Sequence, residues 1–74
     1  MSLRGIGDRW LAGEEIPGVT FALHDAVEVT EGERAGARGV IVLLMMVRPV
    51  PRYLVRLADG ADVRVLQTAL RRTK

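Results

Sequence analysis

Few residues of this 74-residue chain have the chemistry of a catalytic or metal-binding side chain. It contains no cysteine and one histidine, which excludes thiolate chemistry and the common zinc ligand sets. His24 and Asp25 resemble a general base beside its orienting acid, but adjacent strand residues point to opposite faces of a sheet. Glu14 and Glu15 are also adjacent and lack the separation of paired catalytic carboxylates. We therefore expect a protein that is not an enzyme and that uses no cofactor or metal.

Arginine supplies the remaining candidate chemistry, because its guanidinium group binds phosphate and carboxylate groups through two parallel hydrogen bonds. The formal net charge is only +2, but three Arg face seven acidic residues in residues 1–37, whereas eight basic residues face two Asp in residues 38–74. The second half is therefore the candidate surface for RNA, DNA or another anion. Its candidate residues are Arg38, Arg48, Arg52, Arg56 and Arg64. The alternative is that these arginines form ion pairs with acids of the first half, such as Glu28.

Hydrophobic periodicity predicts the elements that would carry these side chains. Val27 and Val29 alternate with polar or small residues, which is typical of a half-buried strand. Glycines at 32, 36 and 39 predict a long loop after it, and two prolines at 49 and 51 predict a connection that cannot continue a strand ladder. The later strands are predicted at 40–47, 52–57 and 62–66, followed by a tight turn at 67–70 that carries Leu70 as an apolar plug.

The last two strands are predicted to form a hairpin around Asp59 and Gly60. A three-residue loop, 59–61, sets Leu57 opposite Val63 and keeps the apolar residues on one face. The same register sets Arg56 opposite Arg64, and directly opposed like charges are destabilising.

Residues 1–20 lack strand periodicity and are predicted to form an arm that packs on the rest of the protein. Asp8 as a cap and Gly13 as a stop allow about one helical turn. Residues 71–74 are predicted to be a basic tail. The longest apolar run, residues 40–47, is far shorter than the roughly 20 residues of a membrane-spanning helix, and the amino terminus lacks the pattern of a secretion signal. A cytoplasmic protein is expected.

Residues 24–41 resemble the KOW motif of SH3-like barrels. Asp25 opens a Val-x-Val strand, a glycine loop follows, and Gly39 begins the next strand before Ile41. The strand, Asp-Gly turn, strand and tight turn of residues 53–70 are similar to the end of such barrels. The resemblance implies an all-β fold, a small SH3-like barrel of about five strands over residues 21–70. Members of this group touch RNA, bind proteins or serve as enzyme subunits, so the fold leaves the function open.

The loop of the motif departs from the RNA-binding members. It carries Glu31 and Glu33 beside Arg34 and Arg38, and is not a basic cluster. This composition argues against phosphate binding by the loop.

The strand at 40–47 is apolar on both faces, although a half-exposed strand should alternate. Either the arm covers its outer side, through Trp10, Leu11, Ile16 and Phe21, or that side is a protein interface. The leading hypothesis is a non-catalytic binding module or small accessory subunit that associates with itself or with another protein. Its candidate interface residues are Val40, Val42, Leu44, Met46 and Trp10. The alternative is nucleic-acid binding through the arginines.

Overall fold

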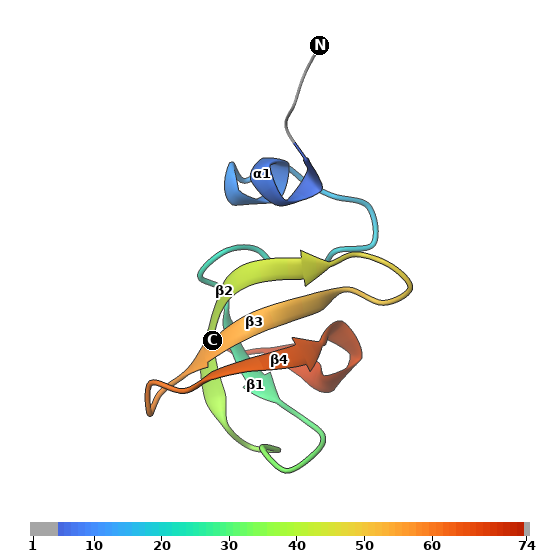
Figure 1. The fold of residues 1–74 in the computed structure, drawn as a ribbon. Coiled ribbons are helices and arrows are strands. Elements are labelled where there is room, and N and C mark those ends of the chain that lie inside the picture. The colour runs from blue at the N-terminus through green and yellow to red at the C-terminus, as the bar shows by residue number, and fades with distance from the viewer. Residues whose placement is uncertain (1–4, 74) are drawn as a thin grey trace.

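The computed structural model describes residues 5–73, which form a five-stranded antiparallel sheet with one short helix. The strands lie in the order β4-β3-β2-β1-β5. Figure 1 shows β2, β3 and β4 side by side below α1. The elements are α1 (Ile6–Leu11), β1 (Ala26–Val29), β2 (Arg38–Met46), β3 (Arg52–Leu57), β4 (Asp62–Leu66), the 3-10 helix η1 (Gln67–Ala69) and β5 (Leu70–Arg72). The all-β prediction with about five strands is confirmed, and β3 and β4 have their predicted bounds.

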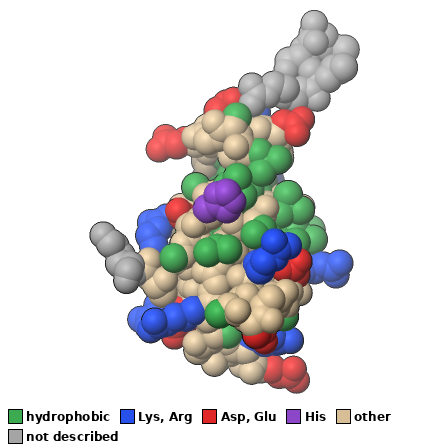
Figure 2. All heavy atoms as spheres, turned by 90° about the vertical axis from the view of Figure 1, so that its left-hand side faces the viewer, with side chains coloured by type: hydrophobic (Ala, Val, Ile, Leu, Met, Phe, Trp, Pro, Cys, Tyr) green, Lys and Arg blue, Asp and Glu red, His purple; other side chains and the backbone are tan. Residues whose placement is uncertain are grey.

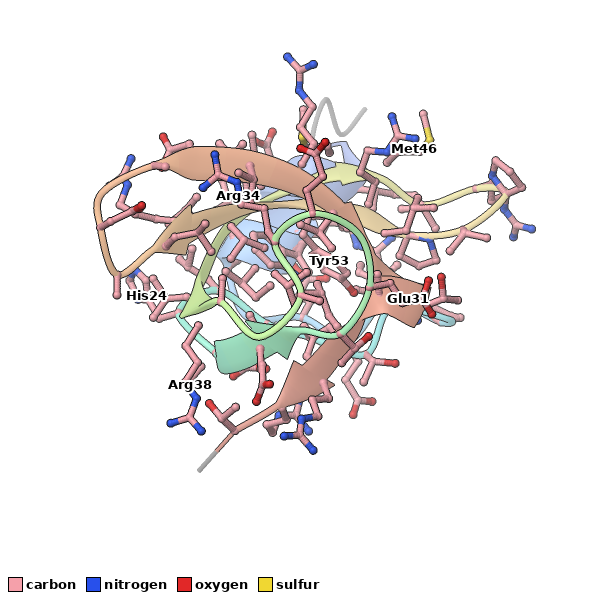
Figure 3. The ribbon with its side chains drawn as sticks, turned by 90° about the horizontal axis from the view of Figure 1, so that it is seen from below. His24, Glu31, Arg34, Arg38, Met46 and Tyr53 are labelled. Carbon is pink, nitrogen blue, oxygen red and sulfur yellow. The ribbon has the colours of Figure 1, made fainter. Side chains whose placement is uncertain are left out.

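The sheet curls strongly, as the path of the chain between its two edges requires. β4 and β5 are the edge strands, yet only the three residues of η1 connect them. The predicted plug, Leu70, is buried at the end of this turn. Seen along the curl, the strands surround Tyr53 (Figure 3).

The carboxyl-terminal segment is not a tail, which corrects the prediction for residues 71–74 as far as they are described. Arg71 and Arg72 belong to β5 and pair with β1 in antiparallel register. Arg71 also forms an ion pair with Glu28, and Arg72 one with Asp25, each at 2.9 Å. The sequence shows no alternating pattern here, because a three-residue strand is too short to have one. Lys74 lies outside the described residues.

The core lies inside the curled sheet. Four side chains in it are fully enclosed: Val27 of β1, Ile41 of β2, and Tyr53 and Val55 of β3. Alternation along β1 and β3 directs Val27, Tyr53 and Val55 inward, and for β1 this is the predicted alternation.

The helix of the arm begins earlier than predicted, and the arm packs against the sheet. The helix α1 starts at Ile6 without a side-chain cap, so Asp8 lies in its first turn and does not cap it. Gly13, with a φ of 89°, follows the helix as predicted. The Trp10 indole Nε1–H donates a 2.8 Å hydrogen bond to the Phe21 carbonyl, which closes the arm on itself over the core.

The hairpin of β3 and β4 has the predicted number of loop residues but a different register. Val55 lies opposite Val63, and Arg56 lies opposite Asp62, not opposite Arg64. The loop is Ala58, Asp59 and Gly60, where Gly60 has a φ of 93° and the Leu57 N–H donates to the Ala61 carbonyl at 2.8 Å. Gly60 occupies the third position of the loop, where the backbone is left-handed. This placement shifts the pairing of β4 with β3 by two residues from the predicted register. The apolar face is preserved by this shift, and the predicted arginine repulsion is replaced by an ion pair.

Gly39 has a structural role that differs from the one predicted. The loop glycines Gly32 and Gly36 have positive φ, but Gly39 does not. It lies inside β2 opposite Leu57, where an added Cβ would collide with the Arg56 carbonyl oxygen and lie 2.9 Å from the Leu57 Cα. Glycine is therefore required at this position so that β2 and β3 can approach each other.

Candidate functional site

Two irregularities in β2 explain why its sequence fails to alternate. Its pairing with β3 shifts by one residue between Ile41 and Leu43, and again between Leu44 and Met46. Each shift is a β-bulge, which inserts an extra residue and moves the following side chains to the opposite face. As a result Ile41 and Leu44, three residues apart, are both buried in the core.

The structure separates the residues that the sequence predicts as one apolar interface. Leu44 is only 6% exposed and faces the core, so its assignment to the outer side is wrong. Val42 is the half-buried extra residue of the first bulge. Val40 and Met46 lie on the outer side, opposite Arg56 and Arg52 of β3.

The outer side of β2, β3 and β4 is defined by their register, because directly opposed residues share a face. We call these nine residues the outer sheet face. Its three rows across the strands are Val40, Arg56 and Asp62; Leu43, Leu54 and Arg64; and Met46, Arg52 and Leu66. Leu43, Met46 and Leu66 are 38%, 41% and 38% exposed. The apolar surface and the arginine surface, which the sequence suggests as separate alternatives, are thus one surface.

Two of the five predicted arginines, Arg56 and Arg38, lie beside acidic residues. Arg56 donates to both carboxylate oxygens of Asp62, at 2.9 and 3.2 Å, and these hydrogen bonds lower the pKa of that carboxyl group. Arg38 lies 3.9 Å from Glu28.

The other three predicted arginines, at 48, 52 and 64, have no acidic partner within 4 Å among residues 5–73. Arg48 lies on the connection after β2, so only Arg52 and Arg64 bring unpaired positive charge to the outer sheet face.

Trp10, the fifth predicted interface residue, is part of the core. It is 3% exposed, and its ring centroid lies 6.5 Å from that of Tyr53. Ile16 and Phe21 of the arm are buried with it, whereas Leu11 is 45% exposed. The arm therefore covers one end of the sheet and leaves the outer sheet face open.

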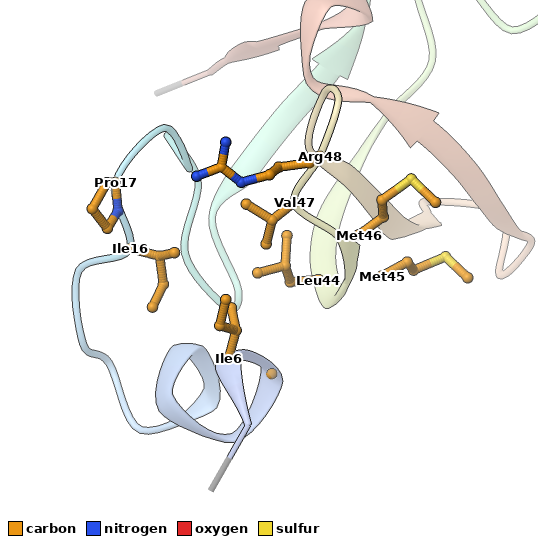
Figure 4. Close-up of a pocket in the computed structure, with 9 residues that line it drawn as sticks. Ile6, Ile16, Pro17, Leu44, Met45, Met46, Val47 and Arg48 are labelled. Carbon is orange, nitrogen blue, oxygen red and sulfur yellow. The ribbon is translucent and has the colours of Figure 1, made fainter.

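A groove of about 440 Å³ lies where the arm meets the end of β2 (Figure 4). Ile6 and Ile16 form its arm side, Leu44 and Val47 its floor, and Arg48 extends over it. Met46 lines the groove and also belongs to the outer sheet face, so the two features are continuous.

A second face of the molecule has a different distribution of side chains. In Figure 2, hydrophobic side chains gather below the arm beside the exposed histidine, and charged groups lie toward the margins and the lower end. His24 has a φ of 71°, and its backbone N–H donates to the Ile41 carbonyl at 2.8 Å. The neighbouring Asp25 carboxylate accepts from the Ala22 N–H and from Arg72, both at 2.9 Å. Asp25 is thus engaged in holding a turn and an ion pair, and not in orienting the histidine.

Gln67 ties the arm to the sheet, and the sequence gives no sign of this role. Its side-chain oxygen accepts from the Tyr53 hydroxyl and, at 2.8 Å, from the Thr20 N–H, while its Nε2 donates to the Gly18 carbonyl at 3.1 Å. Burial raises the pKa of Tyr53, which keeps the phenol protonated as the donor. An amide is well suited to this position because it accepts and donates at once.

No family model, curated protein or solved structure matches the chain. Residues 5–73 contain no group of three or more side chains that could hold a metal ion. None of the helices in this range has the length and apolar character needed to cross a membrane.

Proposed function

We propose that this chain is a non-catalytic binding module or accessory subunit that associates with another protein through the outer sheet face. The observation that carries the proposal is the register of β2, β3 and β4, which joins exposed Leu43, Met46 and Leu66 with Arg52 and Arg64. Larger apolar patches rimmed by polar residues often mark protein interaction sites. Arginine and methionine are both enriched at the centres of protein interfaces.

The charge of this face defines the partner's chemistry. Arg52 and Arg64 lack acidic partners among the described residues, so a protein partner should present aliphatic side chains together with one or two carboxylates. Such a partner would bury the guanidinium groups in bidentate pairs. The groove at the end of β2 adds a place for an aliphatic side chain at the margin of the same interface.

The alternative, nucleic-acid binding, receives less support. Binding of single strands depends on aromatic side chains that stack on bases. The only three aromatic residues of the chain, Trp10, Phe21 and Tyr53, are all buried. Arg56 and Arg38, moreover, are already engaged with carboxylates. The resemblance to SH3-like barrels of the KOW type remains part of the proposal, and the curled sheet with a 3-10 turn between β4 and β5 supports it.

The proposal is tested by capturing partners from the cells that produce the protein. The immobilised wild type is compared with Leu43→Glu, in the middle row of the face, and with Leu11→Glu, an equally exposed leucine on α1. We expect a discrete partner that wild type and Leu11→Glu retain at 0.5 M salt and that Leu43→Glu loses, as apolar association resists salt. Equal capture by all three proteins would refute the assignment of the face.

A fluorescence anisotropy titration tests the alternative at low salt. We expect no saturable binding of labelled RNA or DNA. Tight binding that weakens steeply with salt and with Arg64→Glu would favour nucleic acid over protein as the partner.

A further inference from the structure

The free edge of β4 has backbone groups positioned to pair with another strand. The Leu57 N–H donates to the Ala61 carbonyl, so in an antiparallel ladder Val63 and Val65 are the next residues whose backbone N–H and C=O groups point toward β3. The N–H and C=O groups of Asp62 and Arg64 therefore point away from β3. β4 is the first strand of the sheet, so among residues 5–73 no strand lies on that side.

Charge on an edge strand usually prevents pairing with another copy. On β4, however, the two charges have opposite signs and are two residues apart, with both side chains exposed. Asp62 already pairs with Arg56 of its own chain, and a carboxylate has enough acceptor sites to accept a further hydrogen bond from an arginine of a second copy. A second β4 can lie antiparallel in several registers. A two-fold axis at Arg64 would oppose the two arginines, and one at Val65 would oppose Arg64 with Leu66. An axis at Val63 instead sets Asp62 of each copy opposite Arg64 of the other.

We propose that two copies of this chain dimerise by antiparallel pairing of their β4 strands about Val63. In this register Asp62 and Arg64 are the hydrogen-bonded pairs, because their backbone groups point outward on both copies. Val63 lies opposite Val63 of the second copy, and Val65 opposite Ala61, so the half-buried inner side chains of the two edges also meet. The two five-stranded sheets become one, and the outer sheet faces of the two copies become continuous.

The dimer is expected to be concentration-dependent, because a contact of five residues from each copy is short compared with the interfaces of permanent dimers. Oppositely charged cross-strand pairs stabilise a sheet, and like charges destabilise it. The two-fold axis repeats the pair of Asp62 with Arg64 of the other copy, so the dimer contains this pair twice. A single charge reversal therefore replaces two attractive pairs by two repulsive ones. We expect each reversal to raise the dimer dissociation constant at least about tenfold.

The test is a charge-swap experiment by sedimentation velocity over a concentration series. Wild type should show a dimer fraction that rises with concentration, whereas Asp62→Arg alone and Arg64→Asp alone should stay monomeric over the same range. An equimolar mixture of the two variants should restore the dimer, because each arginine then faces an aspartate. A monomeric wild type near 1 mM, single variants that dimerise like wild type, or a mixture that stays monomeric would each overturn the proposal.

Amide hydrogen exchange of the wild type supplies a second readout that needs no variant. The Asp62 and Arg64 amides should become protected as the concentration rises, while the exposed amides of the loop at 31–36 should not change. Unprotected Asp62 and Arg64 amides in a sample that sediments as a dimer would also overturn it, because another surface would then mediate the contact. The dimer does not depend on the partner-binding proposal. Leu43→Glu should abolish partner capture and leave the dimer intact, so failure of either proposal can be recognised separately.

Discussion

Replacing Gly39 by alanine tests the closest backbone approach in the sheet. The added Cβ would lie 2.9 Å from both the Arg56 carbonyl carbon and the Leu57 Cα, and closer still to the Arg56 oxygen. All three atoms belong to the backbone of β3, so no side-chain rotation relieves the collision. The two strands must separate by several tenths of an ångström at the Gly39–Leu57 pair.

The cost can be assembled from two contributions. Overpacking of a well-packed interior typically costs about 1–3 kcal/mol. Separation also weakens neighbouring backbone hydrogen bonds, such as the 3.0 Å bond from the Ala58 N–H to the Arg38 carbonyl, each worth about 1 kcal/mol. We therefore expect Gly39→Ala to lower the free energy of unfolding by about 3 kcal/mol. This is a large fraction of the roughly 4–11 kcal/mol expected for a chain of this length.

Urea denaturation followed by tryptophan fluorescence measures this effect, because the single, buried Trp10 becomes exposed on unfolding. Gly7→Ala is the matched control. Its Cβ would meet nothing within 4 Å and its φ is not positive, so the substitution should raise the free energy of unfolding by up to about 1 kcal/mol. If Gly39→Ala loses less than about 1 kcal/mol, the close approach of β2 and β3 is wrong.

Three further predictions concern the bulges, the arm and the ion pairs. Leu44→Ala should lower the free energy of unfolding by about 2–5 kcal/mol and Leu43→Ala by less than about 1 kcal/mol, because only Leu44 faces the core. Urea denaturation measures both values, and similar losses for the two variants would contradict the bulged register. Gln67→Ala leaves the Tyr53 hydroxyl and the Thr20 N–H without their acceptor, so it should cost about 2 kcal/mol in thermal unfolding, whereas a neutral result would remove the role of Gln67 in holding the arm. Arg71 hydrogen-bonds Glu28 and lowers its pKa, so folded Glu28 binds protons more weakly than unfolded Glu28. The contribution of Glu28 to the free energy of unfolding should therefore be fully present above about pH 5 and be lost as the pH falls below about 4. In Glu28→Gln that acid loss should be smaller, and an unchanged pH profile would argue against the ion pair.

The sequence predicts the strands well because their signals are local. Val27 and Val29 alternate, prolines bound the connection after β2, and the Asp59-Gly60 pair marks the hairpin. The position of the hairpin loop is wrong by one residue because the parity argument used to place it accepts any shift by two. The conformation of Gly60 decides between those registers, and an ion pair between Arg56 and Asp62 accompanies the observed one.

The candidate surface is harder to predict because it depends on β-bulges and on contacts distant in sequence. An apolar run such as residues 40–47 contains no residue that marks where a bulge will fall, so Leu44 is assigned to the wrong face. The pairing of Arg71 with Glu28 and the contacts of Gln67 with Thr20 join residues more than 40 positions apart. The arginines and the apolar side chains lie on one face, but this can be recognised only when the order and register of β2, β3 and β4 are known.

Site-specific photo-crosslinking shows whether the outer sheet face contacts another protein. A photoreactive amino acid replaces Leu54, at the centre of the face, or Ala35, exposed on the loop between β1 and β2, in protein made in the cells that produce it. We predict a discrete crosslinked product from position 54 and none from position 35. No product from position 54, or the same product from both positions, would mean that the outer sheet face is not the partner-binding surface.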